Sequence, residues 1–282
     1  MTAKTMIKDI VVNLSVGEAS DAATQYAVSV ATAFEAHLAG IAFAYEPIVY
    51  GSPFEGVTAS LIDTERAKRV HAAKTAVAKL EESARRNGVS VETRLLEANF
   101  ADASDRFGMI ARRFDLSIIT QAEPRKLVSE EMIIEAALFS SGRPVLVVPY
   151  IQKSGLKLER VMVCWDGSRN AARATADAIP FLARAKSVDV VMITNGERAK
   201  SDELPGADIA QHLARHGLNI EVKRIVAVDT DVPNAILSYA ADIGADFMVM
   251  GGYGHSRLRE FILGGATRGI LGSMTVPVLM SH

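Results

Sequence analysis

Asp246-Phe-Met-Val-Met-Gly251 is an apolar run that ends in glycine and is followed by a second glycine. Continuous apolar runs of this length are typical of strands buried on both faces of a parallel sheet, where helices cover each side. The same pattern stands earlier in the chain as Asp115-Leu-Ser-Ile-Ile-Thr120. The two runs predict an α/β protein in which one strand–helix unit occurs twice.

Other segments repeat in the same order along the 282 residues. Each half begins with a short apolar strand, contains a helix that ends at a glycine, and closes on a strand that follows a proline. A glycine after a helix is the residue that best adopts the left-handed C-cap conformation. The matching segments are Ile10–Val12 with Val161–Val163, Arg86-Asn-Gly88-Val-Ser-Val-Glu92 with Arg215-His-Gly217-Leu-Asn-Ile-Glu221, and Arg143-Pro-Val-Leu-Val-Val148 with Val276-Pro-Val-Leu-Met-Ser281.

The spacing of the repeats divides the chain unequally. Ile10 and Val161 are 151 positions apart, whereas Gly88 and Gly217 are 129 apart, so the first repeat holds about 22 more residues. We expect them in an insertion near 46–60 and in a longer helix over about 61–86. The predicted domains are 1–150 and 158–282, joined by a polar linker at 151–157.

Each domain is predicted to be a five-stranded parallel sheet with helices on both faces. In the second domain the strands are expected at about 160–165, 188–194, 220–226, 246–251 and 276–281. The helices are expected near 168–184, 206–216, 232–244 and 266–274. The closing strands, Val145–Val148 and Val278–Ser281, are candidates for sheet edges, which either pair with each other or pair with a second copy of the chain.

Composition excludes several classes of protein. Hydrophobic residues make up 49% of the chain and the formal net charge is -2, which gives no general attraction to nucleic acid or to an anionic membrane. No uncharged apolar run reaches the roughly 18 residues of a membrane span. The single cysteine, Cys164, fits a reducing compartment, and the histidines lack the spacing of a metal site. We therefore expect a cytoplasmic protein without a protein-bound metal.

The chemistry is expected in a glycine-rich stretch of the second half. Gly251 and Gly254 follow the strand, and Gly264 and Gly265 precede the next helix, with Thr267 in its first turn. In an open parallel sheet, ligands bind at the carboxyl ends of the strands. Glycines there let backbone N–H groups approach phosphate, and the helix dipole favours the anion. A purely structural use of each glycine in a turn is the alternative.

The pattern Gly251-x2-Gly254-x9-Gly264, followed by a helix and Val276-Pro-Val-Leu, resembles the ATP-binding subgroup of the universal stress protein family. Two units in one chain resemble a tandem member over nearly the whole length. The resemblance implies a flavodoxin-like, adenine-nucleotide alpha-hydrolase-like fold for each domain, and ATP, AMP or ADP as the ligand, with Mg²⁺ on its phosphates.

The same resemblance implies the residues of the nucleotide site. Asp166 would hydrogen-bond the ribose or adenine, although Asp166 or Ser168 could instead only cap the next helix. Backbone groups near Ile193 and Thr194 would hold the adenine, and Met250 would lie against it or belong to the core. The implied site consists of Cys164, Trp165, Asp166, Ile193, Thr194, Met250, Gly251, Gly254, His255, Gly264, Gly265, Ala266 and Thr267.

Departures from the family pattern affect both halves. Gly265 stands where the family usually has Ser or Thr, which removes one hydroxyl donor to phosphate. In the first half, Gln121-Ala-Glu-Pro-Arg125 replaces the glycine pair, and Asn13-Leu-Ser15 replaces the strand-end Asp. Glu130–Met132 occupies the region of the second glycine cluster, where carboxylates repel an anion. We expect the first domain not to bind ATP in the way of the family; it either binds another ligand or only pairs with the second domain.

Three functions remain open at this point. The first is a regulatory stress-response protein that binds ATP in the second domain. The second is an enzyme that hydrolyses or transfers from the nucleotide, slowly, with His255 as the nearby imidazole and Arg257 or Arg268 against phosphate charge. The third is an interaction module without nucleotide. The two domains are expected to form an internal pseudo-dimer, and a homodimer of the chain is the alternative.

Overall fold

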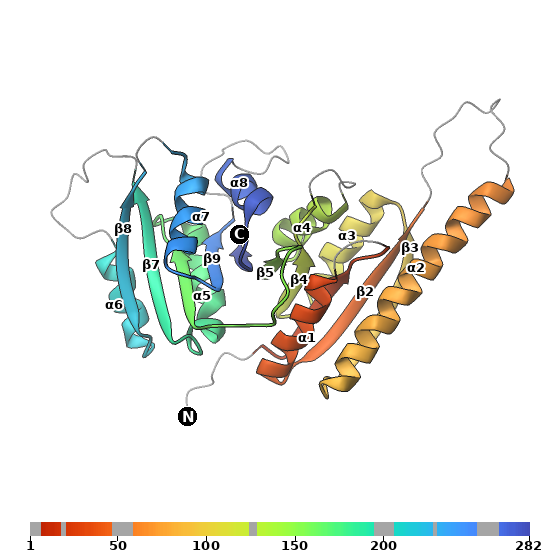
Figure 1. Ribbon diagram of the computed structural model, residues 1–282, viewed down its shortest axis with the longest axis horizontal. Helices are drawn as coiled ribbons and strands as arrows, with labels where there is room; N and C mark the ends of the chain where they lie inside the picture. Colours follow the sequence, from red (N-terminus) through yellow and green to blue (C-terminus); the bar gives the residue numbers. More distant parts are fainter. Residues whose placement is uncertain are drawn as a thin grey trace. The chain divides into compact units, whose positions relative to one another are not determined.

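A computed structural model describes residues 7–17, 21–46, 59–123, 129–194, 206–227, 230–252 and 265–282. These residues fall into two compact units, a first unit at Ile7–Arg143 and a second unit that includes Pro144–His282. The two halves have the same order of elements (Figure 1). The predicted α/β class, with parallel strands and helices on both faces, is confirmed.

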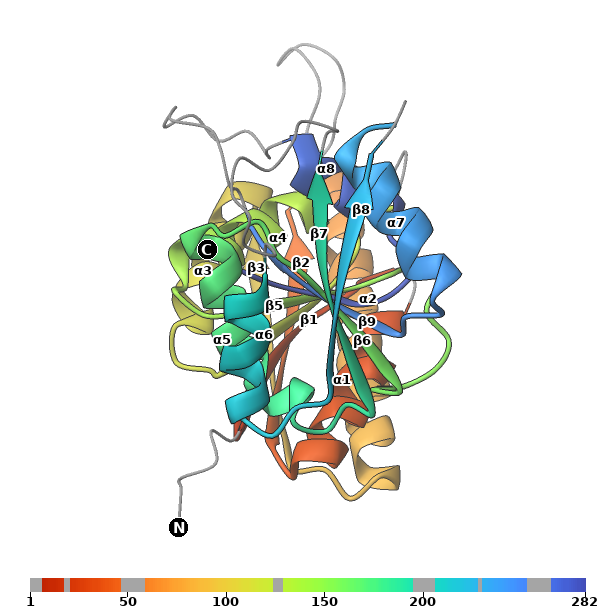
Figure 2. The same ribbon diagram turned by 90° about the vertical axis from the view of Figure 1, so that its left-hand side faces the viewer.

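The first unit contains a parallel sheet in the order β3-β2-β1-β4. Helices α1 and α2 pack together, and α3 packs on α4. These pairs lie on opposite faces of the sheet (Figure 2). The elements are β1 (Asp9–Leu14), α1 (Ala22–Phe34), β2 (His37–Tyr45), α2 (Ala59–Arg86), β3 (Val91–Ala98), α3 (Phe100–Ala111), β4 (Leu116–Thr120) and α4 (Ser129–Ser140).

The second unit has the strand order β5-β10-β9-β6-β7-β8, in which only the β5–β10 pair is antiparallel. Helices α5 and α6 lie on one face, and α7 lies on the other with α8 packed against it (Figure 2). The elements are β5 (Val145–Val148), β6 (Arg160–Cys164), α5 (Arg169–Leu182), β7 (Ser187–Thr194), α6 (Ala207–Arg215), β8 (Ile220–Val226), α7 (Val232–Asp242), β9 (Phe247–Gly251), α8 (Gly265–Ser273) and β10 (Val278–Ser281).

The last strand of the first repeat therefore completes the sheet of the second unit. Val147 stands opposite Val278, and Val145 stands opposite Met280. All four side chains are fully buried, and the pairing covers the edge that β10 would otherwise expose. These two strands were expected to pair either with each other or with a second copy of the chain, and in the structure they pair with each other.

An aspartate holds the start of the sheet in both repeats. Oδ2 of Asp115, just before β4, accepts hydrogen bonds from the backbone N–H of Lys8 at 2.9 Å and of Asp9 at 3.1 Å. Asp246, just before β9, accepts from the N–H of Glu159 at 3.0 Å and of Arg160 at 3.4 Å. The recurrence places β1 with β4, and β6 with β9, in the same register.

The helices account for the unequal lengths of the repeats. α2 has 28 residues whereas its counterpart α6 has 9, as the predicted longer helix requires. Both helices are followed by a glycine in the left-handed region, Gly88 with φ 66° and Gly217 with φ 76°. The remaining part of the expected insertion, residues 47–58, lies outside the described residues. No helix in the described part of the chain is long and apolar enough to cross a membrane.

Candidate functional site

Strands β6, β7 and β9 bring the predicted site residues to one edge of the second sheet. β6 lies between β9 and β7, with Val163 paired to Val249 and Cys164 paired to Val191. The N–H of Trp165 continues the pairing, with 2.8 Å to the carbonyl of Val191. The chain leaves β6 toward β7 on one side and returns to β9 on the other. Such a switch point is where open parallel sheets bind ligands.

The turn from β6 into α5 separates the two interpretations of Asp166. Ser168 is the N-cap, because its Oγ accepts a hydrogen bond from the N–H of Ala171 at 3.1 Å. The exposed Asp166 accepts from the N–H of Ser168 at 2.9 Å through Oδ1. Gly167 between them has φ 76°, which favours glycine. The helix cap is therefore Ser168, and Asp166 uses one of its two carboxylate oxygens to shape the turn.

Cys164 at the end of β6 has a thiol whose pKa is raised. Burial, and then the neighbouring Asp166 carboxylate, raises the pKa of its thiol from 9.0 to about 12. The reactive form of cysteine is the thiolate, which is therefore nearly absent at pH 7.

Gly251 is required by the approach of α5 to the end of β9. A Cβ atom at this position would lie 2.6 Å from the backbone nitrogen of Ala171 and 2.7 Å from the carbonyl carbon of Asn170. Both contacts are with backbone, which cannot rotate away. Gly251 thus allows the start of α5, with its partly positive N-terminus, to lie directly against the strand end.

Gly252 is hydrogen-bonded on both sides, and one of its partners was not predicted from the sequence. Its N–H donates to the carbonyl of Ser281 at 2.8 Å. Its carbonyl accepts from Nδ2 of Asn170 at 2.6 Å and lies 3.1 Å from Nδ1 of His282. One signal was available: asparagine is unfavourable inside helices, yet Asn170 stands in the Ala-rich segment that follows Ser168.

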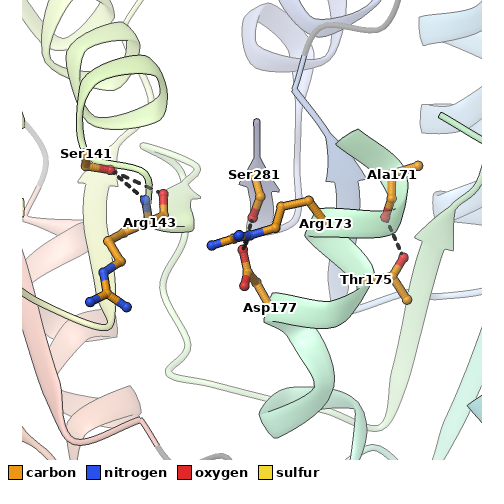
Figure 3. A network of polar contacts seen from close by, with 7 residues as sticks. All are labelled: Ser141, Arg143, Ala171, Arg173, Thr175, Asp177 and Ser281. Atoms are coloured by element: carbon orange, nitrogen blue, oxygen red, sulfur yellow. Dashed lines mark hydrogen bonds and ion pairs between the residues drawn. The ribbon is translucent and has the colours of Figure 1, made fainter. Parts of the chain in front are cut away.

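Helix α5 is also bonded to β10, beside the Gly252 contact. Asp177 accepts hydrogen bonds from Oγ of Ser281 at 2.9 Å and from Nε of Arg173 at 2.8 Å, both at Oδ2. In Figure 3 the side chains of Ser281 and Arg173 both reach the Asp177 carboxylate. Helix α5 is consequently held relative to the sheet by polar contacts of Asn170 to Gly252, just after β9, and of Asp177 to Ser281 of β10.

The residues predicted to hold adenine lie at the end of β7 and in β9. Ile193 and Thr194 are half-buried, and the carbonyl of Thr194 accepts from the N–H of Ala227 at 2.9 Å. Met250 is 7% exposed and is paired with Met280 of β10. Met250 is thus a buried residue of β9, directly before Gly251.

The start of α8 presents the second predicted cluster. Gly265 and Ala266 are exposed, whereas Thr267 is 3% exposed. A Cβ atom added to Gly265 would meet nothing within 4 Å. Farther along, Gly269 allows α8 to pack on α7, since its Cβ would lie 2.7 Å from Pro233. The predicted site residues Gly254, His255 and Gly264 lie outside the described residues.

The equivalent edge of the first sheet carries hydroxyl and amide side chains where the second sheet has Asp166 and the glycines. Ser15 stands at the position of Asp166 and Thr120 at that of Gly251, and their hydroxyl oxygens are 3.1 Å apart in a hydrogen bond. Gln121 follows and is 2% exposed. Glu130 and Glu131 lie in the first turn of α4, where negative charge stabilises the helix but repels phosphate. Among the described residues of either unit, no group of three side chains is placed to hold a metal ion.

Parallel strands covered by helices on both faces define an α/β protein with its candidate site at the carboxyl edge of the second sheet. The model of the universal stress protein family matches residues 157–282. The match covers less than half of the chain and lies within the second unit.

A curated protein is similar to about half of the chain. The chain is 26% identical over 151 residues to the universal stress protein Slr1230 of Synechocystis sp. (strain ATCC 27184 / PCC 6803 / Kazusa), an alignment covering 52% of this chain and 49% of that protein. The chain thus spans about half the length of this curated relative.

Two solved structures are similar over the full length of the chain. A universal stress protein from Archaeoglobus fulgidus DSM 4304 has a TM-score of 0.69 and 16% identity, with 97% of each chain covered. A putative universal stress protein from Pseudomonas aeruginosa UCBPP-PA14 has a TM-score of 0.59 and 15% identity, with 99% of this chain and 95% of that chain covered. At these identities the similarity establishes the fold alone.

Proposed function

We propose that the chain is a tandem universal stress protein, and that its second domain, residues 158–282, binds ATP or another adenine nucleotide as a regulatory component of a stress response. The first domain, residues 1–150, binds no nucleotide in this way and serves as the structural partner of the second. The repeated order of elements and the aspartates at 115 and 246 support the tandem arrangement.

One observation carries the nucleotide proposal. At the carboxyl edge of the second sheet, Gly251 admits the N-terminus of α5 to backbone contact, whereas at the same edge of the first sheet Ser15 and Thr120 bond to each other. A phosphate site needs backbone N–H groups and helix N-termini that side chains do not block. At the second edge the start of α8 meets this criterion, because Gly265 and Ala266 are exposed and the space around Gly265 is open, whereas at the first edge hydroxyl side chains stand at the corresponding strand ends.

The expected positions of the ligand follow from the order of elements along this edge. Asp166, at the end of β6, would bind the ribose or adenine, and the ends of β6 and β7 at Cys164, Trp165, Ile193 and Thr194 would lie near the base. Phosphates would be held by Gly254, His255 and the stretch Gly264–Thr267 at the start of α8. Mg²⁺, when bound, would supply charge neutralisation on the phosphates.

Isothermal titration calorimetry with ATP and AMP tests this proposal. We expect one nucleotide per chain, and loss of binding in Gly254→Val, because a branched side chain would block the backbone approach. The matched control is Glu123→Val, which changes the equivalent position of the first repeat. No heat at millimolar nucleotide, a second site per chain, or equal loss of binding in both variants would contradict it.

A further inference from the structure

Strand β8 forms the free edge of the second sheet within the part of the chain that the structure describes. β8 pairs with β7 on one side, and no described strand lies on its other side. In Figure 2 this edge faces the viewer, with β8 between α6 and α7. Two of its apolar side chains are exposed, Val222 by 40% and Val226 by 49%. An exposed edge strand with apolar side chains is a template for pairing with another strand.

The backbone of β8 alternates between β7 and the free edge. The carbonyl of Asn219 accepts a hydrogen bond from the N–H of Val188 in β7 at 3.0 Å. At the other end of β8, the N–H of Ala227 donates to the carbonyl of Thr194 in β7 at 2.9 Å. The pairing between these two bonds is regular, so the odd-numbered residues of β8 bond to β7. The N–H and C=O groups of the even-numbered residues, among them Val222, therefore point to the free edge.

The charges on β8 select one register for pairing with a second copy of the chain. In an antiparallel pair centred on Val222, this residue stands opposite its own copy and the two exchange N–H···O=C hydrogen bonds. Glu221 of each copy then stands opposite Lys223 of the other in the adjacent non-hydrogen-bonded pair, where side chains lie closest. A centre at Glu221, Lys223 or Arg224 would instead set two like charges opposite each other.

The two charged side chains can exchange partners at low cost. Within one chain, Nζ of Lys223 lies 2.8 Å from Oε2 of Glu221, and these side chains are 43% and 65% exposed. An exposed ion pair of this kind contributes little to stability. Its replacement by two pairs across an interface therefore sacrifices little in the single chain.

We propose that the protein forms a homodimer through an antiparallel β8–β8 pair centred on Val222. The interface is isologous, because the same residues of both copies contribute to it, and main-chain hydrogen bonds extend the second sheet into that of its partner. A single edge pair is a small interface, so the dimer is in equilibrium with the monomer. This association does not depend on nucleotide binding.

The counterpart edge strand of the first unit, β3, lacks the apolar part of this pattern. β3 has the same order of charges, with Glu92 and Arg94 joined at 3.4 Å. Thr93 stands between them where β8 has Val222, and its hydroxyl donates to Glu81 of α2 at 2.8 Å. None of the large apolar side chains of β3 is exposed. β3 therefore provides a matched control for the charges of β8.

Sedimentation equilibrium of the full chain over a concentration series tests the proposal. Glu221→Lys and Lys223→Glu each set like charges opposite each other in the dimer, and the double variant restores opposite charges. Val222→Pro removes an N–H that points away from β7, which an edge strand tolerates. Glu92→Lys is the control in β3. Thermal unfolding of every variant establishes that it is folded, and the charge variants decide the outcome if Val222→Pro is unstable.

The wild type is expected to dimerise reversibly. Each single charge variant should raise the dissociation constant of the dimer about tenfold, because the two-fold symmetry changes two pairs at once. The double variant should return to within about twofold of the wild type, Val222→Pro should be monomeric, and Glu92→Lys should behave as the wild type. A wild type that stays monomeric up to about 1 mM would overturn the proposal. Failure of the double variant to recover, or an equal loss in Glu92→Lys, would overturn it as well.

Discussion

Replacement of Gly265 by serine should strengthen ATP binding. Gly265 is the first residue of α8, and a Cβ atom added there would meet no atom within 4 Å. Its φ lies outside the range that favours glycine, so the backbone accepts an L residue without strain. Serine would restore the hydroxyl that the family pattern usually places there, at the end of the helix that is expected to face phosphate.

The magnitude follows from the bond that is added. A hydrogen bond to a charged group contributes about 1.5–3 kcal/mol, and ordering the serine side chain offsets part of this. We expect a net gain of about 1.4 kcal/mol, which is a tenfold lower Kd for ATP. Adenosine, which carries no phosphate, should bind with unchanged affinity.

Gly265→Ala is the matched control for this variant. Alanine reduces the conformational freedom of the unfolded chain and favours the helix as serine does, but it has no hydroxyl. The ratio of the ATP Kd values of the alanine and serine variants, from titration calorimetry, isolates the hydroxyl. Equal Kd values in the two variants, or a serine variant that gains equally for adenosine, would refute the placement of phosphate at the start of α8.

Three further predictions concern the edge of the second sheet. Gly251→Ala should lower the free energy of unfolding by about 1–3 kcal/mol in urea titrations, because the new Cβ meets the backbone of α5. Gly272→Ala is the control and should not destabilise the chain, because a Cβ there meets no atom within 4 Å. Equal effects of the two variants would argue against the close approach of α5 to Gly251. The Cys164 thiol has a pKa of about 12 in the folded chain and of 9.0 when unfolded, so the unfolded chain ionises first as the pH rises. The free energy of unfolding should therefore be about 1.4 kcal/mol lower at pH 10 than at neutral pH, and Cys164→Ala should lack this difference. The same difference in Cys164→Ala would exclude this thiol as its cause. Asp166→Asn keeps an oxygen acceptor for the turn but removes the charge, so it should weaken nucleotide binding with little change in the free energy of unfolding. Ser168→Ala removes the helix cap, so it should lower the free energy of unfolding by about 1 kcal/mol and leave nucleotide binding unchanged. The reverse pattern would assign the capping role to Asp166.

Much of the fold was predictable because burial on both faces of a sheet leaves a direct trace in sequence. A strand such as Val161–Val163 is fully buried and is therefore apolar without alternation. The glycines at 88 and 217 were predictable for a local reason as well, since a left-handed helix end tolerates few other residues. These features depend on residues within a few positions of one another.

The candidate site was only partly predictable. Ser168 and Asp166 were both reasonable helix caps, and the hydrogen bonds assign that role to Ser168. Met250 was equally consistent with a ligand contact or the core, and the structure shows that it is buried in β9. In these cases the sequence identifies residue types that suit two roles, and the choice depends on the direction of the side chain.

The sequence by itself determined the order of strands and helices, the repeat of the unit, and the half of the chain that carries the glycines. Only the tertiary structure decided that β5 pairs with β10, that Gly251 is needed for contact with α5, and that Asn170 bonds the Gly252 carbonyl. Periodicity reports which faces of an element are buried, but not which distant atom lies within hydrogen-bond distance. That information arises when helices and strands far apart in sequence are packed together.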